Sequence, residues 1–165
     1  MKIIDKFLSD ENFNLLKEEL IYNPKVPWLW SDRKVFKGDG TDTLVHMAYQ
    51  CHKPTSDYFN TINTYFSLLL NVSSWLRIKM NCTWIDKEAK VFGYHTDIGD
   101  IPNQQAKTAI YYCTTTNGPT VFEDNGEKVD CIENRLLIFD STRRHSGQSH
   151  TEGPARRLVI NFNYF

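Results

Sequence analysis

The sequence has little of what secreted, membrane-spanning or nucleic-acid-binding proteins require. Its 4 cysteines include no CxxC pair, which argues against a structural zinc site and gives no compact disulfide framework, so we expect reduced thiols. Apolar runs are much shorter than a membrane span, and charges interrupt the N-terminal stretch where a secretory signal would be apolar. The net charge is −1 and no basic stripe is present, so we expect no nucleic-acid partner. These absences predict a cytoplasmic protein with no membrane partner, and the sequence carries no signal of oligomeric state.

Length and composition fit one folded domain. A chain of 165 residues with 41% hydrophobic and 13% aromatic residues is long enough to bury most of its apolar surface in one core. It contains no internal repeat and no low-complexity segment. We therefore treat residues 1–165 as a single domain, with a helical bracing region over 1–75 and a jelly-roll core over 76–165.

The bracing region contains two expected helices. Ser9 is a candidate N-cap for an amphipathic helix that should end near Asn23. Apolar side chains recur at helical spacing in a second segment, from Thr55 to about Val72. The composition of residues 43–49 is compatible with a strand between the two helices.

After residue 76 the apolar period changes from helical to alternating, which is typical of strands. Turn sequences separate the runs; Asn117–Pro119 is a strong breaker and Asn125–Gly126 is a tight-hairpin signal. The expected strands span 76–82, 108–114, 120–122, 128–132, 135–139 and 156–162. Many short strands with regular turns predict a mainly β, α+β protein with a double-stranded β-helix core of the jelly-roll or cupin kind, braced by the N-terminal helices.

His95-Thr96-Asp97 is the first motif with metal chemistry. On an extended backbone, residues i and i+2 point to the same side, so the His95 imidazole and the Asp97 carboxylate can reach a common point. An HxD triplet also arises by chance roughly once in three such chains, so a surface turn is the alternative interpretation.

His145 follows 50 residues later, after an apolar strand and a turn-like segment. A strand partner could carry it back to His95 and Asp97. Two imidazoles and one carboxylate on one face, with the opposite coordination positions open, are the ligand set of non-haem Fe(II) oxygenases. A solvated loop histidine is the alternative for His145. His150 has no carboxylate partner by spacing, and we expect it to face solvent.

Polar residues occupy one face of the last strand. Arg157, Val159, Asn161 and Asn163 share this face, and the even positions share an apolar one. If the apolar face packs under the helices, Arg157 points into the barrel, where its guanidinium could hold a carboxylate with two parallel hydrogen bonds, and Arg156 lies outside. The alternative is a solvated face on which Arg157 pairs with a surface acid.

In this order the motifs resemble the iron(II)/2-oxoglutarate-dependent oxygenase superfamily, in the branch that contains the prolyl hydroxylases. The resemblance covers roughly residues 78–165, and the N-terminal half resembles the family only in layout. The matching features, in chain order, are His95–Asp97, Thr108–Tyr112, Asn117–Phe122, Asn134–Asp140, His145 and Arg157.

The resemblance implies that His95, Asp97 and His145 bind one Fe(II) and that Arg157 binds the far carboxylate of 2-oxoglutarate. The chain departs from the family in the spacing of this arginine. Family members usually have their basic residue closer to the distal histidine, whereas Arg157 follows His145 by twelve positions and Arg156 by eleven. The choice between the two arginines therefore depends on which one faces the barrel.

Three further residues are implied to bind the cosubstrate. Tyr112 falls where the family often places a tyrosine hydroxyl on the far carboxylate, with a core tyrosine as the equal alternative. Asn81 is found where relatives have a polar group near the metal-bound end of 2-oxoglutarate. Asn161 lines the pocket because it shares the face of Arg157.

The resemblance implies a hydroxylase that uses Fe(II), 2-oxoglutarate and molecular oxygen, with ascorbate as a reductant, and releases succinate and carbon dioxide. Its substrate is a small molecule or a peptide, and a peptidyl-proline hydroxylase is one form of this expectation. A non-catalytic jelly-roll module that binds a metal or ligand is the main alternative. A zinc hydrolase with the same ligands is the second, although no Glu or His base lies near the HxD motif. Because metal binding needs neutral imidazoles, we predict that it fails as the pH falls through the histidine range near ~6.5.

Two polar segments, residues 84–90 and 31–42, are expected to govern access to the site. Arg77 and Lys79 share a strand face with Asn81, which indicates a contact with an anion or a peptide backbone.

Overall fold

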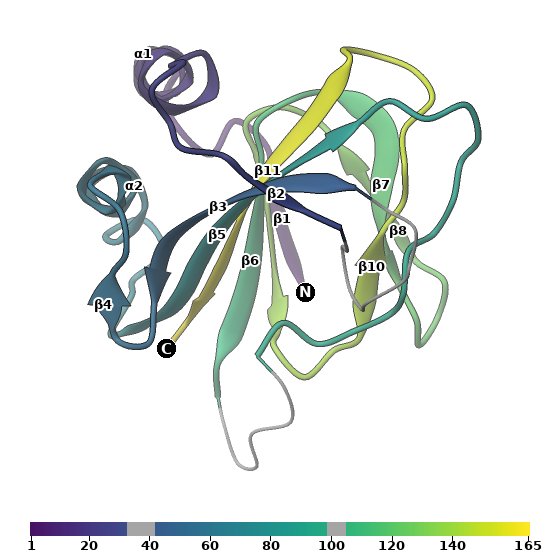
Figure 1. Cartoon of the computed structure of the whole chain (residues 1–165). Helices are drawn as coiled ribbons and strands as arrows, with labels where there is room; N and C mark the ends of the chain where they lie inside the picture. The colour runs from purple at the N-terminus through teal and green to yellow at the C-terminus, as the bar shows by residue number, and fades with distance from the viewer. Residues whose placement is uncertain (33–41, 99–104) are drawn as a thin grey trace.

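The computed structural model describes residues 1–32, 42–98 and 105–165 and consists of two antiparallel sheets and two helical segments (Figure 1). Most of the access segment expected at 31–42 lies outside the described residues. The larger sheet lies between the helices and the smaller sheet (Figure 1). This arrangement confirms the predicted double-sheet, jelly-roll core braced by N-terminal helices.

The larger sheet has 8 strands in the order β1-β9-β6-β11-β5-β3-β2, with β4 paired to β3. Its strands are β1 (Lys2–Ile4), β2 (Leu29–Ser31), β3 (Thr43–Gln50), β4 (Lys53–Pro54), β5 (Trp75–Trp84), β6 (Lys107–Tyr112), β9 (Arg135–Asp140) and β11 (Arg156–Tyr164). Four of these strands come from the region before residue 75, so that region extends the sheet as well as bracing it. Such runs of two to eight residues are too short for apolar periodicity to reveal them all.

The smaller sheet has 3 strands in the order β10-β7-β8. They are β7 (Thr116–Phe122), β8 (Lys128–Cys131) and β10 (His145–Gly147). The expected break at Asn117–Pro119 lies inside β7, where the pairing with β8 is irregular between Thr116 and Thr120. This irregularity accommodates Pro119, which has no N–H to donate, so a proline signal that predicts a turn here marks a bulge instead.

The first helical segment is α1 (Asp10–Leu16), continued by the π-helical turn η1 (Lys17–Ile21). The Ser9 hydroxyl accepts a hydrogen bond from the Asn12 N–H at 3.2 Å, which confirms the predicted N-cap. The second, α2 (Tyr58–Phe66), is shorter than the predicted span of 55–72. Beyond Phe66 the chain continues in turns, and Asn71 has a left-handed φ of 53°, which is incompatible with helix propagation.

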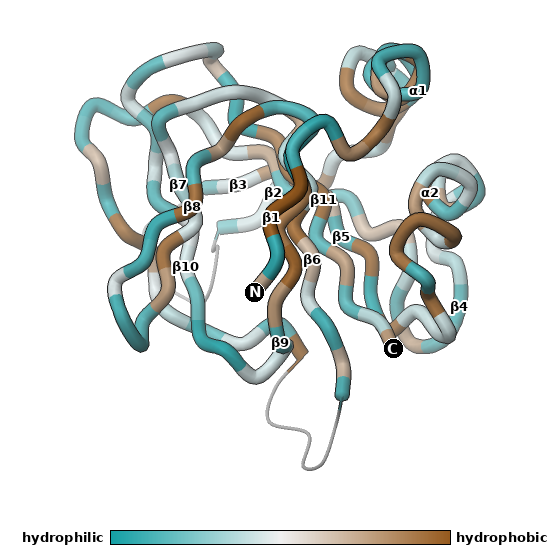
Figure 2. The backbone as a smooth tube through the Cα atoms, turned by 180° about the vertical axis from the view of Figure 1, so that it is seen from behind, coloured by the Kyte–Doolittle hydropathy of each residue, from teal (hydrophilic) through white to brown (hydrophobic). Residues whose placement is uncertain are grey.

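The outer face of the larger sheet packs on the helices through an apolar core. Even-numbered residues of β5 and β11, such as Met80 and Phe162, are fully buried against helical residues such as Leu16 and Phe66. Apolar residues, coloured brown in Figure 2, alternate with polar ones along β5 and are present in both helices. Burial of each such large side chain contributes about 1.5–3 kcal/mol to folding, so this face stabilises the domain.

The inner face of the same sheet is only partly apolar. A second, smaller core fills part of the space between the sheets and includes Ile110, Tyr112, Phe122 and Phe139. The odd-numbered residues of β5 and β11 that face this space are largely polar, which leaves a polar cavity beside the second core.

Two findings concern the expected environment of the protein. No described helix has both the length and the apolar character needed to cross a bilayer. All four cysteines lie in the described residues and are free thiols; only Cys51 is exposed.

Candidate metal centre

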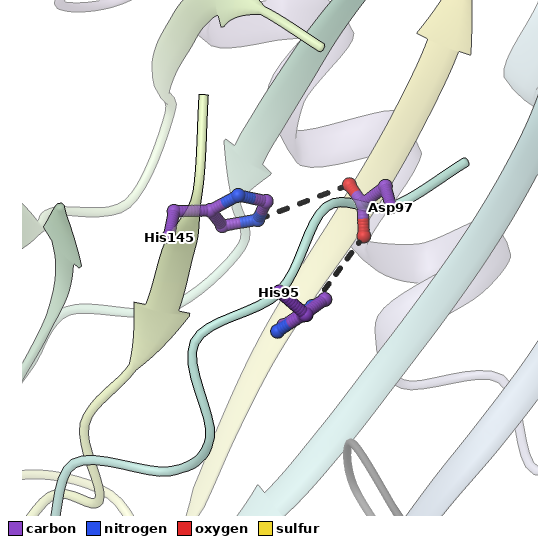
Figure 3. Close-up of side chains that lie close together, drawn as sticks. All are labelled: His95, Asp97 and His145. Carbon is purple, nitrogen blue, oxygen red and sulfur yellow. Dashed lines mark ion pairs between the residues drawn. The ribbon is translucent and has the colours of Figure 1, made fainter. Parts of the chain in front are cut away.

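His95, Asp97 and His145 meet in the space between the two sheets (Figure 3). One ligand atom from each lies within 4.8 Å of the other two. His95 Nε2 is 3.7 Å from Asp97 Oδ1, and His145 Nε2 is 3.9 Å from Asp97 Oδ2. The return of His145 depends on an antiparallel bridge in which the backbone N–H of each histidine donates to the carbonyl of the other at 3.0 Å. His95 thus lies in an isolated bridge rather than in a strand.

Both imidazoles are oriented with Nε2 free to bind a metal. His95 Nδ1 is 3.0 Å from the Gly93 carbonyl oxygen, and His145 Nδ1 is 3.3 Å from that of Arg143. A carbonyl can only accept, so Nδ1 carries the proton and Nε2 presents its lone pair. The buried Nε2 of His145 has no hydrogen-bond partner among the described residues, an arrangement that is unfavourable unless a ligand or ion occupies the site.

His145 is buried against aromatic rings. Its ring centroid is 4.8 Å from that of Phe139 in an edge-to-face arrangement, and 6.4 Å from that of Phe122. Burial lowers the pKa of His145, and the attraction of Asp97 opposes this only in part. The imidazole is therefore held in the neutral form that a metal requires.

Asp97 is held as a carboxylate by neighbours on the inner face of the larger sheet. Its side chain is 3% exposed, and Arg77 Nη2 is 2.8 Å from its Oδ1. Asn163 Nδ2 donates to Oδ2 at 3.4 Å. Burial alone would raise the pKa of Asp97, but the adjacent Arg77 guanidinium holds that pKa well below its usual range. This role of Arg77 and Asn163 was not predicted from the sequence, because only the folded structure brings β5 and β11 next to Asp97.

The donor set fits a divalent metal. Two neutral imidazole nitrogens and one carboxylate suit Fe(II), and the buried lone pair of His145 points to the shared position. The same three donors also suit zinc, so the ligands alone do not select the metal.

Arg157 lines the same cavity as the three candidate ligands, a space of about 280 Å³. Arg157 is 4% exposed, and its Nε donates to the Gly118 carbonyl at 2.9 Å. No carboxylate of the described residues pairs with it, so its terminal N–H groups can bind a ligand. Arg156 is exposed, as the strand alternation predicts. The role of Arg157 in binding 2-oxoglutarate remains a prediction. Its position in the cavity favours Arg157 over Arg156 for this role.

The other predicted cosubstrate residues occupy different positions. Asn81 and Asn161 line the cavity, and Asn161 Oδ1 is buried without a hydrogen-bond partner in the described part of the chain. Tyr112 lies in the second core, and its hydroxyl donates to Thr120 Oγ1 at 2.7 Å. Thr120 in turn lines the cavity, a position that the sequence signals only by its place in a strand. This geometry favours the core interpretation of Tyr112.

His150 is buried, so the prediction that it faces solvent is wrong. Its Nε2 lies 3.0 Å from the Pro154 carbonyl oxygen, and β7 packs directly on it. A Cβ at Gly118 would lie 3.0 Å from the Cβ of His150, so glycine permits this close approach. His150 does not belong to the group of three candidate ligands.

The segment at residues 84–90 is hydrogen-bonded to the chain that follows β10. The Asp86 N–H donates to the His150 carbonyl at 2.8 Å, and the Lys90 N–H donates to Ser149 Oγ at 2.8 Å. Control of access by this segment remains a prediction.

No family model and no curated protein matches this sequence. Solved structures do match it. An oxidoreductase of the 2OG-Fe(II) oxygenase family from Burkholderia pseudomallei aligns with a TM-score of 0.73 at 11% identity, covering 98% of this chain and 83% of that one.

Two further structures match nearly the whole chain. A prolyl hydroxylase from Trichoplax adhaerens, in complex with a hypoxia inducible factor peptide fragment, has a TM-score of 0.65 at 17% identity over 99% of this chain and 82% of that one. HygX from Streptomyces hygroscopicus, with nickel, 2-oxoglutarate and hygromycin B bound, has a TM-score of 0.63 at 11% identity over 98% and 81%. The chain therefore has the fold of the 2OG-Fe(II) oxygenase family. Prolyl hydroxylases have this fold as well.

Proposed function

We propose that this protein is an Fe(II)- and 2-oxoglutarate-dependent dioxygenase that hydroxylates an organic substrate. The observation that carries the proposal is the convergence of His95, Asp97 and His145 on one point of a cavity that also contains Arg157, which pairs with no carboxylate of the described residues. The fold shared with 2OG-Fe(II) oxygenases supports the same conclusion.

The three candidate ligands would bind the metal, and other residues of the cavity wall would bind and orient the cosubstrate. His95, Asp97 and His145 hold the iron on one face and leave the other positions open. Fe(II) bound there would, with 2-oxoglutarate and molecular oxygen, supply the oxidation of a substrate C–H bond to an alcohol, with release of succinate and carbon dioxide.

The remaining residues bind and orient. Arg157 pairs with the far carboxylate of 2-oxoglutarate through its free terminal N–H groups. Arg77 and Asn163 fix the orientation of the Asp97 carboxylate, as outer partners of metal ligands commonly do. The apolar side chains of Ile110 and Val159 line the cavity and exclude water from part of it.

The substrate is a small molecule or a peptide. Proteins of this fold include a prolyl hydroxylase with a bound peptide and HygX with bound hygromycin B. A peptidyl-proline hydroxylase that uses ascorbate as a reductant in the cytoplasm is the finer form of this proposal.

The test is succinate formation from 2-oxoglutarate under air with added Fe(II), in the presence of a peptide and amino-acid panel. We expect succinate from the wild-type protein and none from His145→Ala. The matched control is His52→Asn, because His52 is exposed, lies on a turn with φ of 60°, and asparagine tolerates that backbone. Bound iron without succinate for any substrate would instead identify a binding module. Metal analysis of protein purified without added metal separates iron from zinc.

A further inference from the structure

The cavity contains a second cationic side chain that the proposed cosubstrate does not account for. Lys79 lies on β5 between Arg77 and Asn81, lines the cavity and is half-buried. It forms no ion pair or hydrogen bond with any residue that the structure describes. Arg77, by contrast, is already paired with Asp97 at 2.8 Å. A partly buried ammonium without an anionic partner is unfavourable, and its usual compensation is a bound anion.

Lys79 and Arg157 mark different places in the cavity. The register of β5 and β11 puts Arg157 opposite Thr83 and Lys79 opposite Asn161. The two rows are four residues apart along the strands, which is roughly 13 Å at 3.3 Å per residue. Lys79 therefore lies toward Arg77 and the metal ligand Asp97. If Arg157 binds the far carboxylate of 2-oxoglutarate, Lys79 remains available to bind a different anionic group.

The charges of the cavity also call for a further anion. Among the described residues, its lining has three cationic side chains, Arg77, Lys79 and Arg157, and one carboxylate, Asp97. Binding a divalent metal together with dianionic 2-oxoglutarate does not change this positive excess. With Arg77 paired to Asp97 and Arg157 paired to the cosubstrate, Lys79 is the cation that remains.

A second unsatisfied group lies across from Lys79. Asn161 Oδ1 is buried without a donor among the described residues, and Asn161 is the direct cross-strand neighbour of Lys79. A ligand at this position therefore needs an anionic group for the ammonium and a hydrogen-bond donor for the amide oxygen. An N-acylated amino acid, including the C-terminal residue of a peptide, carries both.

We propose that Lys79 binds the carboxylate of the substrate, so that the enzyme acts on a small carboxylic acid with an adjacent N–H donor rather than on an internal residue of a peptide. This inference rests on the proposed function and names the substrate class of the same site. It takes the place of the peptidyl-proline form, because an acylated proline nitrogen has no N–H to donate.

The test uses the whole chain loaded with Zn(II) and 2-oxoglutarate, which holds the cosubstrate without oxidation because Zn(II) has no redox chemistry. The probes are N-acetyl-L-amino acids and their carboxamides, paired so that each pair differs only at the carboxylate. Calorimetric titration gives Kd for each probe. We expect at least one acid to bind about tenfold or more tightly than its own amide, as a charge-assisted hydrogen bond in a partly buried site provides.

Three variants identify the group responsible. Lys79→Met should bring the acid-to-amide ratio close to one while changing Kd for 2-oxoglutarate less than about threefold. Lys79→Arg, which keeps the charge, should retain a preference for the acid. Lys53→Met, an exposed lysine on β4, should behave as the wild type. Melting temperatures check that each variant is folded.

The outcomes separate the two proposals. If Zn(II) and 2-oxoglutarate do not bind to the wild-type chain, both proposals fail. If they bind and no acid binds better than its amide, the proposed function stands and the role of Lys79 is overturned. A Lys79→Met variant that loses 2-oxoglutarate instead of the acid also overturns it.

Discussion

The two faces of the larger sheet are built from the same strands and carry opposite chemistry. On β5, Met80 points to the helices and is fully buried in apolar surroundings, whereas its neighbours Lys79 and Asn81 line the polar cavity. On β11, Phe162 and Asn161 divide in the same way. One face therefore stabilises the fold, and the other is available to bind ligands. Substitutions one residue apart should therefore affect different properties.

The largest expected effect is on the outer face. Phe162 is fully buried, with its ring centroid 4.7 Å from that of Phe66 and 5.6 Å from that of Trp75. Phe162→Ala should lower the free energy of unfolding by about 3–5 kcal/mol, because it leaves a cavity in the main core. Denaturant unfolding measures this loss. Metal affinity of the folded fraction should be unchanged, and a large loss of affinity at constant stability would break the separation of the two faces.

Arg157 on the inner face and its exposed neighbour Arg156 provide a matched pair of substitutions. Arg157→Met should weaken 2-oxoglutarate binding about 10- to 100-fold, because it removes a charge-assisted contact in a buried place. Arg156→Met should change Kd little, since Arg156 is exposed. Titration of the metal-loaded protein with 2-oxoglutarate gives both values. A larger effect at Arg156 would show that the wrong arginine has been assigned to the cosubstrate.

Arg77 lies on the inner face and would act on the metal through Asp97. Arg77→Met should weaken metal binding about 10- to 100-fold, as loss of an outer partner of a ligand does. Arg77 helps to hold the pKa of Asp97 well below its usual range, so its loss raises that pKa and moves metal release to higher pH. Metal binding followed from pH 8 downward measures the shift. Arg135→Met, which breaks the exposed pair with Asp5, is the control, and equal pH profiles for the two variants would contradict this role.

The smallest effect is expected at Tyr112, where the two interpretations differ. Tyr112→Phe removes the hydrogen bond to Thr120 and should lower stability by about 1 kcal/mol. Kd for 2-oxoglutarate should change less than about threefold, because the hydroxyl is directed to Thr120 in the second core. A much larger loss of 2-oxoglutarate affinity would restore Tyr112 as a cosubstrate ligand.

Strand alternation made much of this division predictable from the sequence. The alternating residues of β11 predicted that Arg157 and Arg156 lie on opposite faces. The packing of the apolar face on the helices then places Arg157 on the inner face and Arg156 outside. The prediction that His145 lies next to His95 and Asp97 required a particular strand pairing, because 50 residues of sequence separate His145 from His95. It holds because His95 and His145 form an antiparallel bridge.

Other features depend on contacts that no local pattern encodes. The pairing of Arg77 with Asp97 requires a loop residue to meet a strand 20 positions earlier in the chain. The burial of His150 follows from the packing of β7 at Gly118. Strands such as β1, β2 and β10 have 3 residues each, too few to show a period.

The claim that three residues of the inner face hold one Fe(II) is tested most directly by an anaerobic Fe(II) titration of the wild-type chain and His145→Ala. Because burial lowers the pKa of His145, the wild type should bind one Fe(II) per chain near neutral pH and keep it to a pH below ~6.5, the ordinary value for histidine. His145→Ala should lose this binding while remaining folded. Stoichiometric Fe(II) binding of equal affinity by both proteins would contradict the site.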